Sequence, residues 1–148
     1  MSIHHFENYS IYANGVGIHF DLSRIEELYN RAQYWLDSRI MTDMVLLMPH
    51  LTGTFINKTR MASAALAGTG KVVAAAAPEG RFLYMGKVMV DPNTGSPWAQ
   101  PGAKKVVTDR PLVYSNPSAV PLWFEEAKNR HLHEWVNGVK AVIGGNNA

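Results

Sequence analysis

The sequence predicts a single α+β domain with two long helices, a few short strands and a long loop rich in Pro and Gly. Apolar residues recur at helical spacing over residues 23–47 and 119–143, which predicts the two helices. Alternating apolar residues flank Asn14-Gly15, which predicts a β-hairpin. Six of the eight prolines lie between residues 92 and 121, which excludes a regular helix over that segment.

Length and composition narrow the class of protein. The 148 residues fit one domain, since domains typically have about 100–150 residues. An apolar share of 47% and a charged share of 18% exclude a disordered chain and a coiled coil. The absence of Cys excludes disulfides and thiolate metal sites, and it fits a reducing cytoplasm. We also expect no Sec signal, because the N-terminus has neither a basic n-region nor an apolar h-region, and no membrane span, because no apolar run approaches about 18 residues.

The N-terminal third is predicted to be a hairpin followed by a helix. The hairpin covers residues 8–20, with apolar positions on both sides of its turn. Ser23 and Glu26 fit a capping box, which predicts that the helix over 23–47 begins there. Pro49 ends it. The apolar series of this helix is Ile25, Leu28, Tyr29, Ala32, Trp35, Leu36, Ile40, Met44 and Leu47.

The middle of the chain is predicted to contain a strand, a short helix and a second strand over residues 72–91. A turn follows Pro49, and residues 60–67 fit either a strand or a short helix. Residues 72–77 are predicted to form a buried strand, residues 79–85 a short helix, and residues 87–91 another strand.

The C-terminal part is predicted to be an extended loop followed by a helix. Residues 92–118 form a Pro/Gly-rich arm, and loops of this length are usually functional. Short strands within it are predicted at 104–108 and 112–114. Pro121 suits the first turn of the helix over 119–143, which Gly144-Gly145 ends. Its apolar stripe is Val120, Phe124, Ala127, His131, Trp135, Val139 and Val142.

No pattern of catalytic, cofactor or metal-binding residues is complete. Gly68-Thr-Gly-Lys71 resembles the end of a phosphate loop, but it lacks the first Gly and the following Ser or Thr. His131 and His133 are two residues apart, so on a helix they point about 200° apart and cannot share one metal ion. We therefore predict no catalytic residue, no cofactor and no metal, and the two histidines are interpreted as a packed and a solvated side chain.

Aromatic and basic residues gather around the long loop. Basic residues exceed acidic ones by three over residues 71–110, which fits contact with DNA phosphates, an acidic partner, or ordinary surface lysines. Trp98 lies between prolines and has little of its own chain to cover it, so we expect an interface anchor there. The candidate interface residues are Arg81, Tyr84, Trp98, Lys104, Lys105, Arg110 and Tyr114.

Several motifs resemble a family of bacteriophage proteins. Pro49-His-Leu-Thr-Gly-Thr-Phe is similar to its P-x-x-T-G-x-L/F turn after the first long helix. Ala77-Pro-Glu-Gly-Arg-Phe-Leu-Tyr-Met-Gly-Lys-Val-Met-Val-Asp91 resembles its A-P-Y-A-R-x-L-Y-Y-G-K-x-M-V-D block, departing from it at Glu79-Gly80 and Met85. Gly102-Ala-Lys-Lys-Val-Val-Thr-Asp-Arg-Pro-Leu112 and Trp123-Phe-Glu-Glu-Ala-Lys128 continue the resemblance, which covers residues 22–142.

This family is the minor capsid proteins of long-tailed bacteriophages and prophages, which belong with the head–tail connector, or neck, proteins. The resemblance implies a small antiparallel sheet with a long helix packed on it and a C-terminal helix. It implies a virion structural protein with no enzymatic role, made in the host bacterial cytoplasm. It further implies a six- or twelve-fold ring around the DNA channel at the head–tail junction. The expected partners are the portal or adaptor, head-completion and tail-terminator proteins, with packaged DNA close by.

Two other functions compete with this one. A nucleic-acid-binding module would use the basic segment 71–110, and its affinity for DNA would fall steeply with salt. A small hydrolase would use the histidines and would carry bound metal after purification. In the connector, by contrast, the loop 92–118 and the hairpin 8–20 are expected to join neighbouring subunits.

Overall fold

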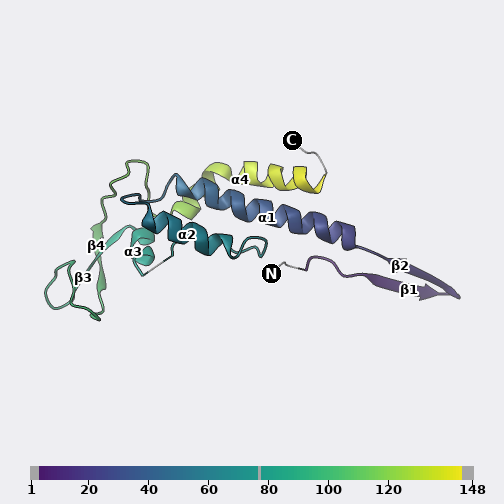
Figure 1. Cartoon of the computed structure of the whole chain (residues 1–148), viewed down its shortest axis with the longest axis horizontal. Coiled ribbons are helices and arrows are strands. Elements are labelled where there is room, and N and C mark those ends of the chain that lie inside the picture. Colours follow the sequence, from purple (N-terminus) through teal and green to yellow (C-terminus); the bar gives the residue numbers. More distant parts are fainter. Residues whose placement is uncertain (1–3, 77, 145–148) are drawn as a thin grey trace.

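A computed structural model describes residues 4–76 and 78–144 of the chain (Figure 1). It confirms the α+β class, both long helices, the N-terminal hairpin and the short helix before residue 86. The ambiguous segment around residues 60–67 lies largely in a helix. In chain order the elements are β1 (Tyr9–Ala13), β2 (Val16–Phe20), α1 (Ser23–Val45), α2 (Thr54–Ala64), α3 (Gly80–Met85), β3 (Lys87–Val90), β4 (Val106–Pro111) and α4 (Trp123–Ile143).

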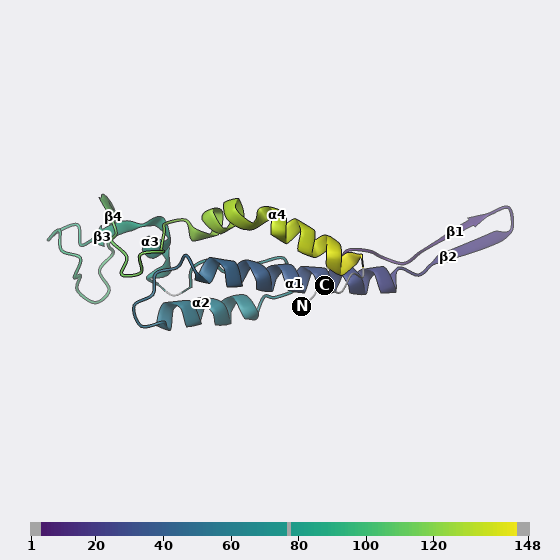
Figure 2. The same cartoon turned by 90° about the horizontal axis from the view of Figure 1, so that it is seen from above.

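The molecule is elongated, with α1 as its spine. Helices α4 and α2 lie along α1, as both views show (Figures 1 and 2). The β1–β2 hairpin extends from one end, and α3 with β3 and β4 forms the other end. The strands make two separate two-stranded antiparallel ribbons rather than one sheet. The long helix α1 therefore packs chiefly on other helices.

The hairpin turn follows from its sequence. Asn14 and Gly15 have φ angles of 52° and 79°. Two successive residues with positive φ are what a two-residue type I′ turn requires, and Asn-Gly adopts this turn readily. The resulting register pairs Tyr9 with Phe20 and Ala13 with Val16.

The predicted capping box at the start of α1 is wrong. The Ser23 side chain makes no capping bond. The backbone N–H of Ser23 instead donates to Asp21 Oδ1 at 3.0 Å. Glu26 turns away from the helix end and accepts the N–H groups of His5 and Phe6 at 2.9 and 2.8 Å. The chain before the hairpin folds back along α1, and its free backbone donors compete successfully for the carboxylate.

The core lies between α1, α2 and α4. Trp123 is fully buried and meets Tyr84 and Phe55 edge-on, with ring centroids 4.8 and 5.9 Å apart. Its indole N–H donates to the carbonyl of Ala74 at 2.8 Å. Methionines, which adapt to irregular gaps, supply three of the buried side chains. The buried apolar cluster is Met41, Met44, Leu47, Met48, Ile56, Trp123, Ala127 and Trp135.

The buried strand predicted over 72–77 does not form in residues 72–76, and Ala77 lies outside the described residues. Side chains take the backbone bonds that a neighbouring strand would have made. Ser63 Oγ accepts the N–H of Val73 at 2.9 Å and donates to its carbonyl at 3.0 Å. Thr59 Oγ1 accepts the N–H of Ala76 at 3.1 Å. The segment is thus held against α2 as an unpaired stretch that bends at Ala74 and Ala75.

Helix α4 begins later than the sequence predicts. Pro121 is not in its first turn, because Leu122 has a left-handed φ of 52° and the helix starts at Trp123. Two backbone bonds hold this entry: Val120 N–H to Leu47 O at 3.1 Å and Leu122 N–H to Tyr84 O at 2.8 Å. Such a conformation is costly for a residue other than Gly and persists only where surrounding contacts enforce it. Here it places Trp123 in the core.

The 92–118 arm is partly regular. Strand β4 pairs with β3, with an irregularity between Lys87 and Met89. The strand predicted at 104–108 forms only from Val106, and residues 112–114 form no strand. Leu112 instead closes the arm through one bond, its N–H donating to the carbonyl of Gly86 at 2.9 Å.

Two contacts set how α4 lies on α1. Asp43 is 5% exposed and accepts the Trp135 indole N–H at 2.7 Å and the Arg39 Nε–H at 3.0 Å. Gly138 lies against the ring of Trp35, where an added Cβ would be 1.9 Å from Cη2. A glycine is therefore required at this crossing, in the C-terminal third of α4.

Replacing Asp43 tests the buried hydrogen bond. Asp43→Ala should lower the free energy of unfolding by about 2–4 kcal/mol, because Trp135 loses its buried acceptor and Arg39 loses one of its two carboxylate partners, keeping only Glu134. Urea denaturation measures this. The matched control is Glu27→Ala, which breaks the exposed pair with Arg31 and should cost less than about 1 kcal/mol. Equal effects of the two variants would contradict the assigned role of Asp43.

Replacing Gly138 tests the helix crossing. In an isolated helix Gly138→Ala would be stabilising by about 1 kcal/mol. Here it should destabilise the protein by about 1–3 kcal/mol, since the methyl group meets the Trp35 ring. The double variant Trp35→Leu/Gly138→Ala should be more stable than the sum of the two single effects predicts. Strict additivity in thermal unfolding would show that the ring and the glycine are not coupled.

Candidate interaction surfaces

Four of the candidate interface residues lie at the surface of the β3–β4 end. The Trp98 side chain is 87% exposed, and Lys104 and Arg110 are also exposed. Lys105 is half-buried, and its Nζ donates to the carbonyl of Pro97 at 2.5 Å. This bond ties the base of the arm to the loop that carries Trp98. An indole held out in solvent in this way is available to a partner.

The two tyrosines among the candidates have roles within the chain. Tyr114 Oη donates to the carbonyl of Leu83 at 2.6 Å, and Tyr84 packs on Trp123. Burial raises the pKa of both phenols, and the charge of Glu125 raises the pKa of Tyr84 further. The aromatic cluster seen in the sequence therefore divides into packed tyrosines and an uncovered tryptophan.

An apolar groove of about 420 Å³ lies beside α3 and β4. Arg81 is its one charged residue, exposed on α3. Tyr84 lies in its wall, so the structure brings two of the candidate residues together here. The groove is lined by Ala74, Ala75, Arg81, Phe82, Tyr84, Met85 and Val107.

The opposite end of the molecule carries the hairpin. All ten of its strand residues are exposed. It is attached to α1 through Asn8, whose Oδ1 accepts the Leu22 N–H at 2.6 Å, and through the bonds from His5 and Phe6 to Glu26. The Phe6 and Tyr29 rings meet edge-on at 4.8 Å. The base is therefore fixed, whereas the strands project beyond the body (Figure 2).

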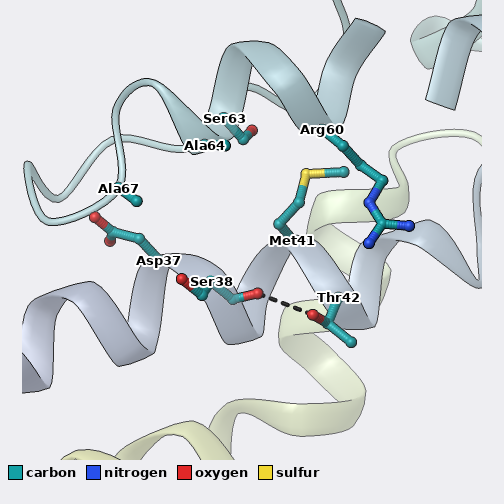
Figure 3. Close-up of a pocket in the computed structure, with 8 residues that line it drawn as sticks. All are labelled: Asp37, Ser38, Met41, Thr42, Arg60, Ser63, Ala64 and Ala67. Atoms are coloured by element: carbon teal, nitrogen blue, oxygen red, sulfur yellow. Dashed lines mark hydrogen bonds between the residues drawn. The ribbon is translucent and has the colours of Figure 1, made fainter. Parts of the chain in front are cut away.

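The glycine loop at residues 68–71 binds a carboxylate of its own chain. Asp37 Oδ2 accepts the N–H groups of Gly68 and Gly70 at 2.8 and 3.0 Å, where both glycines have positive φ. Two backbone N–H groups that would suit a phosphate thus hold Asp37, which is 4% exposed. In Figure 3, Asp37 and Arg60 lie at opposite ends of the adjoining hollow of about 210 Å³. The loop that follows α2 is thus hydrogen-bonded to α1 and holds the two helices together.

The histidines of α4 bond to neighbours on the same helix. His131 Nδ1 lies 3.1 Å from Glu134 Oε2, and His133 Nδ1 lies 3.1 Å from Asn137 Nδ2. Within residues 4–76 and 78–144, no group of three or more His, Asp or Glu side chains could hold a metal ion. His131 is half-buried and His133 exposed, as interpreted from the sequence.

Sequence reasoning missed the two buried aspartates of α1. Asp37 and Asp43 lie among the apolar positions of α1 without belonging to its stripe, and each has a partner that is distant in the chain, the glycine loop for Asp37 and Trp135 for Asp43. Two signals were present: a charged residue flanked by core positions, and two glycines close together at 68 and 70. Neither signal indicates which residue would form the hydrogen bond with each aspartate.

No protein-family model, curated protein or solved structure matches the chain. None of the helices in the described part of the chain is long and apolar enough to cross a membrane.

Titration of Glu26 tests the attachment of the N-terminal segment. Burial acts to raise the pKa of Glu26, but the hydrogen bonds from Phe6 and His5 outweigh it and hold this pKa below its ordinary value. The attachment should therefore be complete above the ordinary pKa and be lost as the pH falls through the lowered one. The amide NMR signals of His5 and Phe6 should report this midpoint.

The control is Glu26→Gln, which should remove the titration of both amides and leave those in α4 unchanged. A midpoint at or above the ordinary value of 4.5 would show that the two N–H groups do not stabilise the carboxylate.

Proposed function

We propose that the chain is a structural protein of the bacteriophage neck, part of the ring-shaped connector between the DNA-filled head and the tail. The observation that carries the proposal is the placement of uncovered apolar and aromatic residues at both ends of an elongated molecule. Surfaces of this kind mark protein–protein contacts. The motifs over residues 22–142 that resemble those of phage minor capsid proteins support the neck as the place where the protein acts.

The proposed partners are further copies of the chain, in a six- or twelve-fold ring, and the proteins above and below it. These are the portal or adaptor, head-completion and tail-terminator proteins. In this proposal the protein is made in the bacterial cytoplasm, ends in the virion and has no enzymatic role. Trp98 is proposed as an anchor for one of the neighbouring neck proteins, because it is 87% exposed on an arm.

The alternative is a nucleic-acid-binding module. The observation in its favour is the cluster of basic side chains around the β3–β4 end, with Lys104 and Arg110 exposed. This alternative predicts binding to naked DNA that weakens steeply with salt. In the neck proposal these basic side chains lie near packaged DNA, and the protein does not need to bind free DNA in solution.

Native mass spectrometry with the neighbouring neck proteins tests the proposal. We expect six or twelve copies on a portal-side or tail-side partner. Trp98→Ala should weaken that association by at least about tenfold, since a central interface tryptophan typically contributes 2 kcal/mol or more. The control is Tyr34→Ala, which removes an aromatic ring that is 60% exposed on α1, away from the arm.

Two results would contradict the proposal. One is a chain that binds none of the neck proteins. The other is salt-sensitive binding of free DNA by the protein, which would favour the nucleic-acid-binding module. An unchanged association of Trp98→Ala would remove Trp98 from the contact.

A further inference from the structure

The β1–β2 hairpin has one wholly apolar face. Residues paired across the two strands lie on the same side, so three pairs share this face. The first pair stacks, with the Tyr9 and Phe20 rings 4.6 Å apart. The other face carries the Ser10–His19 hydrogen bond of 2.8 Å and the Tyr12 ring over Gly17. The apolar face consists of Tyr9, Ile11, Ala13, Val16, Ile18 and Phe20.

Nothing in the described part of the chain covers this face. Ile11 is 48% exposed and Val16 61%. An isolated two-stranded hairpin is marginally stable at best in water, and it needs further strands or a packing surface. An ordered ribbon with one apolar face therefore requires a partner.

The surface that fits this face is the groove beside α3 and β4. It is apolar except for Arg81, and β4 contributes Val107 to it, which is 52% exposed. The charges of the two ends are opposite. Residues 4–22 carry Glu7 and Asp21 and no Lys or Arg, a formal charge of −2. Residues 79–114 carry five basic and three acidic residues, a formal charge of +2.

The hairpin cannot reach the groove of its own chain. The 23 residues of α1 lie between them, a rigid span of about 34 Å. We propose that the apolar face of the β1–β2 hairpin of one copy docks into the α3–β4 groove of a second copy. The contact joins two different patches, so repetition produces a closed ring or an open filament. This inference deepens the proposed function, on which its setting in the neck rests.

The first test compares the oligomeric state of single variants at millimolar concentration by sedimentation velocity. The wild-type protein should self-associate. Ile11→Asp should raise the dissociation constant by at least about tenfold, because a charged carboxylate on the apolar face must lose its water when the contact forms. Ser10→Asp adds the same charge on the other face of the same strand and should leave association unchanged.

A matched pair tests the groove. Val107→Asp should abolish association, whereas Val113→Asp, at a residue 95% exposed outside this groove, should not. At a concentration low enough for the wild type to be monomeric, the unfolding temperature of Ile11→Asp should equal that of the wild type, because the hairpin strands stabilise no part of the body. A lower value would mean that the chain itself covers the face, which would overturn the proposal.

The most discriminating test mixes Ile11→Asp with Val107→Asp, the two variants that should not self-associate. Ile11→Asp keeps an intact groove and Val107→Asp keeps an intact hairpin, so the mixture should form one-to-one dimers that neither variant forms alone. A wild-type monomer, or a mixture without dimers, would overturn the proposal. So would self-association of Val107→Asp alone, which would indicate hairpin-to-hairpin pairing. Self-association without binding to neck proteins would refute the proposed function and leave this contact intact.

Discussion

The hydrogen bond from the Trp135 indole to the Asp43 carboxylate is the contact on which the arrangement of the protein depends. Asp43 lies in the last turn of α1, where the helix dipole disfavours a negative charge. It is tolerated there because Trp135 and Arg39 both donate to it. This bond fixes the position of α4 along α1, and Gly138 lets the two helices approach at Trp35. The same register brings Trp123 onto Tyr84, and so it also positions α3 and the β3–β4 end.

A narrow layer of helices on one spine leaves both ends of the molecule uncovered. The buried cluster lies where α1, α2 and α4 meet, and its methionines fill an irregular space. Neither ribbon packs into that cluster. Apolar side chains that a more compact chain would bury are thus displayed on the hairpin and around the groove by α3. Such a shape favours assembly, because apolar side chains that remain exposed on one chain can be buried by contact with another chain.

The candidate site was predictable where exposure follows from local sequence. Trp98 lies between prolines, in a loop that cannot fold over it, and it is exposed. Tyr84 and Tyr114 belong to the same aromatic stretch, yet they are packed. Aromatic residues are common both in cores and at interfaces, so residue type alone does not separate the two environments. The glycine loop likewise gave no indication that Asp37 would occupy its N–H groups.

By itself the sequence determined the elements that rest on local interactions. Helical periodicity placed α1 and α4, and Asn14-Gly15 placed the hairpin, because neighbouring residues settle those conformations. Tertiary structure decided the rest: the unpaired segment at 72–76, the start of α4 after Leu122, and the turn of Glu26 toward His5 and Phe6. In each case a backbone group had several possible partners along the chain. The partner found in the structure lies 10 to 73 residues away, from Ser63 for Val73 to Leu47 for Val120, and only the packing of the helices brings it within hydrogen-bonding distance.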